Sequence, residues 1–305
     1  ELFHLFVVFV FYIITTKDFG FSFKYILDIA PSFLLSNAIA MFIIILIFDM
    51  LNKYKNAEVK EVVNETELST AAKIQTSMLP QNKGDLGETF RFSLFADMCP
   101  SKKVGGDFYD FFYVDKNNLC IIVGDTSDKG VGSALFSVKV KQMLKDYINI
   151  ESSIDSAITK VNKELIKDNF QLMFVTLFAG IINLQTGKLT YINAGHCPPI
   201  YYDGELKTLD KLSGPALGVV EANYISFYEK LSVNSNLVIY TDGVTDAVNK
   251  DNEQYGIDRF KKYVRANKNS TSKTFVKKAL DEIKEFGPEQ VDDVTILELR
   301  YKGRK

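Results

Sequence analysis

The sequence of 305 residues predicts an α+β sandwich that is preceded by apolar helices and a polar linker helix. From Phe90 onward, apolar or alternating runs of strand length follow one another, joined by hairpin-type turns such as Asp203-Gly204. Helical segments are grouped in pairs between and after these runs, so that they can cover the faces of antiparallel sheets. Before this region the chain is first almost uncharged and then rich in Glu, Lys and Asn.

The composition excludes several classes of function. A net charge of −2 and a pI near 5.9 give no basic surface for a nucleic acid, so no nucleic-acid partner is expected. Cys99, Cys120 and Cys197 are scattered without a CxxC pair, which argues against a zinc site and a disulfide framework. His4 and His196 are the two histidines, too few for chemistry that needs a histidine base and histidine ligands.

Residues 1–48 are predicted to form a membrane region of two helical segments. Ile29–Phe48 has no charge until Asp49 and reaches the roughly 20 residues that cross a bilayer. Leu2–Ile14 is shorter and is interpreted as the remainder of a span, because the chain starts at Glu1 without Met and is expected to be part of a longer protein. Between them we expect a charged loop, which carries Lys17, Asp18, Lys24 and Asp28. A signal peptide fits poorly, since there is no basic leader and no small-residue cleavage site; a buried core helix remains the other alternative.

Residues 49–80 are predicted to form a linker helix that leaves the membrane, since the stretch contains no Gly or Pro before Pro80. Its second half carries one stripe with the spacing of a coiled-coil seam. The stripe consists of Leu68, Ala72, Gln75 and Leu79. We expect it to pair two subunits as a homodimer; the alternative is a solitary solvated helix.

Residues 81–305 are predicted to form the sandwich domain, after a loop at Gln81–Thr89. The predicted strands are Phe90–Met98, Phe108–Val114, Leu119–Val123, Phe174–Asn183, Lys188–Asn193, Ile200–Tyr202, Tyr224–Lys230, Leu237–Thr241 and Val294–Arg300. The predicted helices are Val131–Ile150, Ile154–Lys167, Asp258–Ala266 and Thr271–Phe286.

Acidic residues recur where these strands begin or end. Asp107 and Asp125 each follow a glycine, Asp242 follows the buried run LVIYT, and Asp292 and Asp293 precede the last strand. If the strand ends converge, these carboxylates repel one another unless cations are present. A hard divalent cation suits such oxygen ligands. The alternative is a set of unrelated turns, in which Asp after Gly is ordinary.

The combined motifs resemble the bacterial metal-dependent serine/threonine phosphatases of the PP2C type, in the branch of SpoIIE and RsbU. The motifs are GGDFYD (105–110), GDTSDKGVGSALF (124–136), NAGHCPPI (193–200), GPALGV (214–219), YTDGVTDA (240–247) and DDVTIL (292–297). The segment AAKIQTSMLP (71–80) resembles the helix that leads into that domain, so the resemblance covers about residues 71–299.

This resemblance implies a four-layer αββα sandwich that holds two Mn²⁺ or Mg²⁺ ions. Asp107 and Asp125 are implied as metal ligands, with Asp125 as the bridge and the carbonyl of Thr126 as a backbone ligand. Asp242 and Asp292 complete the implied set, with the neighbouring Asp293 as a lesser candidate. Two such ions activate a water for attack on a phosphoserine or phosphothreonine and neutralise charge on the phosphoryl group.

The chain departs from the family pattern in the turn after Asp125. Asp128 stands where the family commonly has Gly, and Gly132-Ser133 stands where Pro-Ala is common. Asp128 adds a carboxylate that is expected to tune or bind metal. His196 is a candidate hydrogen-bond or proton donor to the phosphate, with a structural role in a turn as the alternative.

The function expected from these motifs is a membrane-tethered phosphatase whose catalytic domain is cytoplasmic. Its expected substrate is a phosphorylated partner protein, in this branch an anti-anti-sigma protein of the STAS type. A diguanylate cyclase is one alternative, because GGDFYD resembles its signature loop; it requires a βαββαβ domain. A catalytically weak scaffold of the same fold is the other.

Overall fold

The computed structural model describes residues 2–17, 19–80, 89–167, 169 and 172–303. The chain divides into two compact units, Glu1–Thr66 and Glu67–Lys305. The last turns of the predicted linker helix, from Glu67 onward, therefore belong to the second unit. Most of the predicted loop at Gln81–Thr89 lies outside the described residues, which resume at residue 89.

The N-terminal region is helical. Helix α1 is Leu2–Thr16 and helix α2 is Phe19–Met78. The predicted charged loop is wrong in extent, because Lys24 and Asp28 lie inside α2; they are four residues apart, a spacing that a helix accommodates on one face. Among the described residues, Leu34–Met78 contains a window that is long and apolar enough, by length and composition, to cross a membrane.

The described residues of the second unit form two five-stranded antiparallel sheets. The first sheet has the order β1-β10-β9-β6-β7, with β1 at Phe92–Cys99, β10 at Val294–Tyr301, β9 at Ser235–Tyr240, β6 at Ile200–Tyr202 and β7 at Leu206–Thr208. The second has the order β2-β3-β4-β5-β8, with β2 at Phe108–Tyr113, β3 at Asn118–Thr126, β4 at Val175–Asn183, β5 at Lys188–Ala194 and β8 at Phe227–Lys230.

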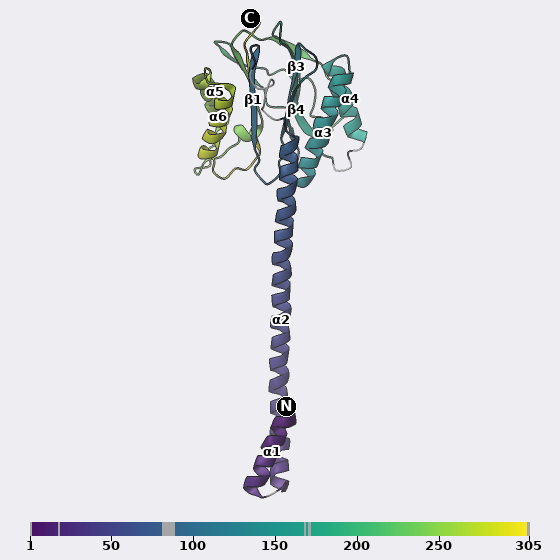
Figure 1. Cartoon of the computed structure of the whole chain (residues 1–305), viewed down its shortest axis with the longest axis vertical. Coiled ribbons are helices and arrows are strands. Elements are labelled where there is room, and N and C mark those ends of the chain that lie inside the picture. The colour runs from purple at the N-terminus through teal and green to yellow at the C-terminus, as the bar shows by residue number, and fades with distance from the viewer. Residues whose placement is uncertain (1, 18, 81–88, 168, 170–171, 304–305) are drawn as a thin grey trace. The chain divides into compact units, whose positions relative to one another are not determined.

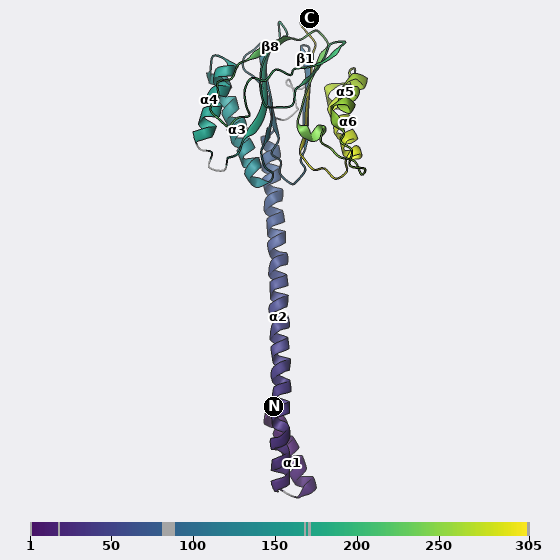
Figure 2. The same ribbon diagram turned by 180° about the vertical axis from the view of Figure 1, so that it is seen from behind.

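Two helices cover the outer face of each sheet, as Figures 1 and 2 show. Helices α3 (Val131–Ile150) and α4 (Ile154–Lys167) pack on the second sheet, and α5 (Gly256–Asn267) and α6 (Ser272–Phe286) pack on the first. The predicted α+β, four-layer αββα sandwich is therefore confirmed. A diguanylate cyclase is excluded for this domain, because two packed antiparallel sheets are not a βαββαβ unit.

Three apolar clusters hold the layers together. The central cluster lies between the sheets and includes Tyr109, Phe178 and Ile239, while the other two lie beneath the helix pairs. Burying one such large side chain contributes roughly 1.5–3 kcal/mol. Leu79, just after the end of α2, packs against the central cluster. The sandwich core thus reaches the end of the linker helix.

Strand β3 is longer than predicted, and this extension matters for the site. Asp125 and Thr126 belong to the strand, where they pair with Thr176 and Val175 of β4. A Gly-Asp pair commonly ends a strand, but here both residues have partners in the neighbouring strand. Elsewhere β8 begins at Phe227 instead of Tyr224, and the short strand β7 was not predicted.

Candidate metal site between the two sheets

Asp107 lies between a glycine turn and the first residue of β2, and it is almost completely buried. Its Oδ2 accepts hydrogen bonds from Thr295 Oγ1 (2.5 Å) and Thr241 Oγ1 (2.8 Å). Burial, and next the nearby Asp125, raise the pKa of Asp107 well above its usual value, while the two threonines oppose this. Thr295 of β10 and Thr241, the residue after β9, thus fix the carboxylate that precedes β2.

Asp125 lies close to all four of the other predicted acids. Burial raises its pKa to about 7; Asp242 is the next cause, and Asp292 and Asp293 raise it further. A hydrogen bond with Asp107 opposes the rise. Carboxylates that raise one another's pKa in this way share one small volume. The structure therefore brings the predicted acids together.

Asp242 starts a short 3-10 helix, η2 (Asp242–Val244), directly after β9. Partial burial, then Asp292, raise its pKa, although its side chain reaches the surface. The next residue has to be glycine, because a Cβ on Gly243 would lie 2.0 Å from the carbonyl oxygen of Asp293. This close approach sets the acid after β9 beside the acids that precede β10.

The neighbouring acids Asp292 and Asp293 have different surroundings. Asp293 is buried, and its Oδ1 accepts from the Ser101 amide (2.7 Å) and hydroxyl (3.0 Å), while its Oδ2 accepts from the Gly106 amide (2.6 Å). Asp292 is partly exposed and pairs with Lys129, with 2.9 Å between Oδ2 and Nζ. Asp293 therefore anchors the loop that leads to Asp107, which favours Asp292 as the ligand of the pair.

Thr126 is held beside Gly106, in the turn that precedes Asp107. Its Oγ1 donates to the Gly106 carbonyl (3.0 Å) and contacts the hydroxyl of Ser133, which is buried in the first turn of α3. A Cβ on Gly106 would lie 2.5 Å from both hydroxyl oxygens and 3.2 Å from the Thr126 carbonyl oxygen. Only glycine lets the turn before Asp107 pass this close to that carbonyl. Ser133, a departure from the family pattern, thus has a buried partner.

The residues present fit a hard divalent cation. They offer carboxylate and carbonyl oxygens, the ligands that Mg²⁺ and similar ions take. Burial and then the neighbouring carboxylates raise the pKa values of Asp107, Asp125 and Asp242, and a cation would relieve this repulsion. In the described parts of the chain, no three Asp, Glu, His or Cys side chains stand in the arrangement that holds a metal ion. The acids are therefore gathered but not yet in ligand geometry.

His196 is buried behind these acids. Its Nδ1 lies 3.0 Å from the hydroxyl of Thr176, the strand partner of Asp125. Asn193 holds its backbone, accepting from the His196 amide (2.8 Å) and donating to its carbonyl (3.1 Å). Burial lowers the pKa of His196 to about 4. A neutral imidazole held in this way fits the structural alternative better than proton donation.

Two further residues lie near the acids, and the sequence had indicated only the first of them as a site residue. Asp128 is exposed and adopts a left-handed backbone with φ of 67°. Cys197 was not predicted as a site residue, yet burial, and next Asp242, raise the pKa of its thiol to about 12. The thiol therefore stays protonated in the metal-free chain.

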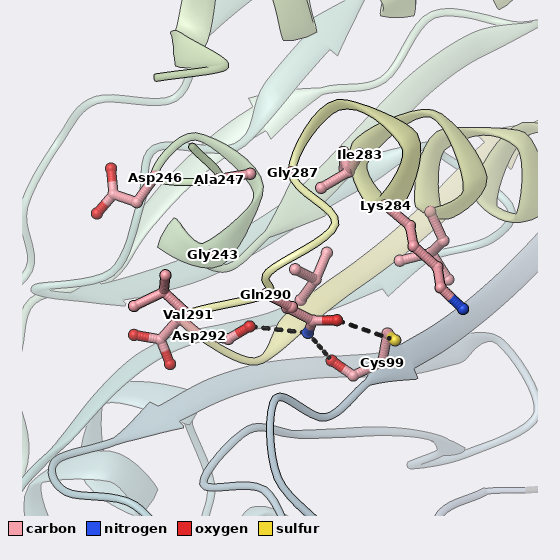
Figure 3. A pocket seen from close by; sticks show the side chains of 12 residues that line it. Cys99, Gly243, Asp246, Ala247, Ile283, Lys284, Gly287, Gln290, Val291 and Asp292 are labelled. Atoms are coloured by element: carbon pink, nitrogen blue, oxygen red, sulfur yellow. Dashed lines mark hydrogen bonds between the residues drawn. The ribbon is translucent and has the colours of Figure 1, made fainter. Parts of the chain in front are cut away.

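A cavity of about 140 Å³ lies beside Asp292. Figure 3 shows Gln290 between Cys99 and Asp292 in its wall. Gln290 Nε2 donates to the carbonyls of Cys99 (2.6 Å) and Asp292 (2.8 Å), so the segment before β10 is fastened to the end of β1. Ile283 and Lys284 of α6 form the opposite wall. No sequence pattern had indicated this pocket.

Gln75 and Leu79, the last two residues of the predicted stripe on the linker helix, contact the chain's own sandwich. Gln75 is buried and forms two hydrogen bonds with Gly105, from its Nε2 to the carbonyl (2.7 Å) and from the Gly105 amide to its Oε1 (3.2 Å). Leu79 packs on the central core, and Leu68 and Ala72 are half-buried. The expected dimer seam is corrected at this point, since heptad-like spacing does not tell a second helix from the chain's own domain.

Sequence comparison identifies relatives of this chain. The sequence profile of the family described as Stage II sporulation protein E (SpoIIE) matches residues 115–302. Protein IcfG of Synechocystis sp. is 32% identical over 275 residues, covering 79% of this chain and 42% of IcfG. Phosphoserine phosphatase RsbU of Bacillus subtilis is 26% identical over 247 residues, covering 78% of this chain and 71% of RsbU. The chain thus spans less than half the length of IcfG.

Solved structures share the fold. The SiaA-PP2C domain of Pseudomonas aeruginosa has a TM-score of 0.69 at 20% identity and covers 80% of this chain and 98% of its own. RsbX in complex with magnesium has a TM-score of 0.55 at 18% identity and covers 70% of this chain and 97% of its own. The catalytic domain of PstP with two manganese ions has a TM-score of 0.53 at 14% identity and covers 69% of this chain and 98% of its own. With the profile match over more than half its length, the chain belongs to the SpoIIE family, whose phosphatase domain has the PP2C fold.

Proposed function

We propose that this chain is a metal-dependent protein phosphatase that removes phosphate from serine or threonine on a partner protein. One observation carries the proposal: Asp107, Asp125, Asp242 and the pair Asp292-Asp293 come from four separate segments and gather at one point, where burial and then the neighbouring carboxylates raise the pKa values of Asp107, Asp125 and Asp242. The relative RsbU is named a phosphoserine phosphatase, and the neighbouring structures RsbX and PstP hold magnesium and two manganese ions. These names support a site for two Mn²⁺ or Mg²⁺ ions here.

The residues that would hold the ions are Asp107, Asp125, Asp242, Asp292 and the carbonyl of Thr126. When bound, the ions activate a water and neutralise the phosphoryl oxygens. Asp107 is oriented for this role by Thr241 and Thr295, which occupy its Oδ2. Asp293, the lesser candidate, keeps its oxygens on Ser101 and Gly106 and holds the loop in place.

The pocket beside Asp292 is the proposed place for a residue that neighbours the phosphorylated one. It opens next to the acids, since Gly243, Asp246 and Asp292 line it together with apolar residues of α6. Lys284 at its wall offers a positive charge to an acidic substrate segment. An anti-anti-sigma protein of the STAS type is the substrate class that the family resemblance suggests.

A tether to the cell membrane, with the catalytic domain on the cytoplasmic side, completes the proposal. The apolar window within Leu34–Met78 supports it, as does the exposure of its side chains, for example Phe42 and Ile47. A helix of this composition that exposes its apolar side chains is more stable in lipid than in water. Sedimentation of the chain with membranes, and its release by detergent but not by high salt, tests the tether.

We propose that α2 also transmits regulation to the site. Its last turns hold Gly105 through Gln75, and its terminal carbonyl at Met78 accepts from Lys141 Nζ of α3 (2.8 Å). Lys141 also lies 3.7 Å from Asp110, a buried acid of β2. Movement of α2 would thus act on the loop before Asp107 and on α3 together. A coupling of about 1–3 kcal/mol would change activity roughly 5- to 150-fold.

A homodimer remains part of the proposal, through residues other than those that contact the sandwich. Val59, Val63, Ile74 and Met78 of α2 are exposed apolar side chains. A second copy of the helix would cover them. Ile74→Glu with Val63→Glu should then yield monomers in sedimentation, whereas Leu79→Glu should instead disturb the packing of the subunit itself.

The catalytic proposal is tested by phosphate release from a phosphoserine protein by the full chain in detergent, with and without Mn²⁺. Asp125→Asn should lower turnover by about 100-fold or more, because even changes in the partners of ligands cost about 10- to 100-fold. Asp203→Asn is the matched control, an exposed acid in the β6–β7 turn. Equal turnover of both variants would refute the metal site, and absence of any Mn²⁺-dependent release by the unmodified chain would favour the catalytically weak scaffold.

A further inference from the structure

Lys129 lies against the proposed metal ligands. It stands in the turn between β3 and α3, and its Nζ is 2.9 Å from Oδ2 of Asp292. The same ammonium donates to the carbonyl of Val291 (2.7 Å). It also acts on Asp242, whose pKa its positive charge lowers. A lysine thus occupies the side of the acidic cluster where the acids from β9 and β10 meet.

The ammonium lies on a carboxylate oxygen that Asp292 would offer to a divalent cation. Oδ1 of Asp292 already accepts from the Asp293 amide (2.8 Å), so Oδ2 is the oxygen directed at Lys129. A cation bound to Asp292 would carry twice the charge of the ammonium and would repel it at this short range. Without a cation, Lys129 partly offsets the repulsion among the carboxylates.

We propose that Lys129 is a built-in counter-ion, which holds Asp292 while the metal is absent and leaves it when a divalent cation binds. Metal binding at this position is then an exchange of one positive group for another. This inference rests on the proposed metal-dependent function. It adds that the chain itself sets the metal concentration at which Asp292 becomes a ligand.

The surroundings of Lys129 allow the exchange to be local. Its side chain is 33% exposed, and that of Asp292 is 38% exposed, so the ammonium can turn to solvent without disturbing the core. Asp128 and Gly130 flank it with φ of 67° and 105°, which places the turn outside regular structure. The contacts that would break are the ion pair with Asp292 and the hydrogen bond to the Val291 carbonyl.

The exchange is tested by Mn²⁺ binding to the full chain in detergent, without substrate, followed by electron paramagnetic resonance of free Mn²⁺. Lys129→Gln should bind Mn²⁺ about two- to fivefold more tightly, the range expected for loss of a partly exposed ion pair. Lys129→Arg should bind like the unmodified chain. Lys116→Gln makes the same charge change in the exposed β2–β3 turn, at the other end of these strands, and should leave the affinity unchanged.

A second readout is the melting temperature. In chelator Lys129→Gln should melt below the unmodified chain, because the acids lose a counter-ion, and saturating Mn²⁺ should abolish that difference. Circular dichroism in chelator confirms that each variant is folded.

The outcomes separate this inference from the proposed function. If the unmodified chain binds Mn²⁺ and Lys129→Gln binds it equally or more weakly, the exchange is refuted while the metal site stands. A raised KM for phosphoprotein with unchanged Mn²⁺ affinity would likewise refute it and place Lys129 on the phosphate. If no variant binds Mn²⁺, both the metal-dependent function and the exchange are refuted.

Discussion

Gln75 of the linker helix and Gly105 of the loop before Asp107 are joined by two hydrogen bonds, of 2.7 and 3.2 Å, in a buried position. The side-chain amide satisfies both backbone groups of one residue, so it fixes where that residue lies. Gly105 cannot be replaced without moving Asp293, whose Oδ2 would lie 2.6 Å from an added Cβ. The linker helix and the candidate metal site are therefore joined through one amino acid.

Gln75→Ala should destabilise the second unit by about 1–3 kcal/mol, since the Gly105 amide and carbonyl lose their buried partners. The Mn²⁺ concentration for half-maximal activity should rise, because the loop that carries Asp107 is less well held. Gln142→Ala is the control, an exposed glutamine of α3 whose amide donates to Asp146 of its own helix. Denaturation in chelator and a Mn²⁺ titration of activity measure the two effects. An unchanged titration would show that the bond is structural alone.

The contribution of Asp125 to the stability of the metal-free chain should fall as the pH rises from about 4 to 7. The pKa of Asp125 is raised from 3.8 to about 7 in the folded chain, so between these values the folded state holds a proton that the unfolded state has lost. Its contribution is complete below the unfolded pKa and is lost as the pH rises through the folded pKa, with a slope of at most about 1.4 kcal/mol per pH unit. Melting of the unmodified chain and of Asp125→Asn in chelator measures it as a difference, because burial lowers the pKa of His196 to about 4 and this group changes the stability in the opposite direction over the same range.

In Asp125→Asn that slope should be reduced, since the group that titrates is gone. Saturating Mn²⁺ should remove most of the slope in the unmodified chain by keeping the carboxylate ionised. The stabilisation that Mn²⁺ provides should accordingly grow from pH 5 to pH 8. A stabilisation that is constant across this range would contradict the assignment of Asp125 as a ligand.

Much of the site was predictable because its acids lie near the ends of strands. In the sequence, such an acid appears as a Gly-Asp or Asp-Gly pair beside an apolar run. Asp107, Asp125 and Asp242 were found in this way, and the structure brings them together. Thr295 and Lys129 were not found, because their partners are distant in sequence and known only after folding. The linker stripe was assigned to a second helix because the apolar spacing is the same whether a helix packs on another helix or on its own domain.

Asp128→Gly should stabilise the metal-free chain by up to about 1 kcal/mol. Asp128 has φ of 67°, a conformation that costs an L-residue roughly 1–2 kcal/mol, less for Asp, and that Gly adopts freely. Its carboxylate is exposed, so the Mn²⁺ titration should change little. Asp128→Ala separates the two effects, since it removes the charge and keeps the strain; it should not stabilise. A weaker Mn²⁺ affinity in both variants would instead give this carboxylate a role in metal binding.

Thr295→Val should weaken Mn²⁺ binding about 10- to 100-fold, the usual cost of losing a group that orients a ligand. Thr295 donates to Asp107 Oδ2 at 2.5 Å in a fully buried place, and valine fills the same volume without a donor. This hydrogen bond lowers the pKa of Asp107 and so opposes the rise that burial causes. In the variant, Asp107 should therefore hold its proton more tightly, and the chain should bind metal only at higher pH. Thr295→Ser keeps the hydroxyl and should bind nearly as well as the unmodified chain. Mn²⁺ affinity measured from pH 6 to pH 9 distinguishes this effect from a packing defect. A packing defect would lower the affinity equally at every pH. If the missing hydrogen-bond donor is the cause, the loss of affinity should be largest at pH 6 and shrink toward pH 9.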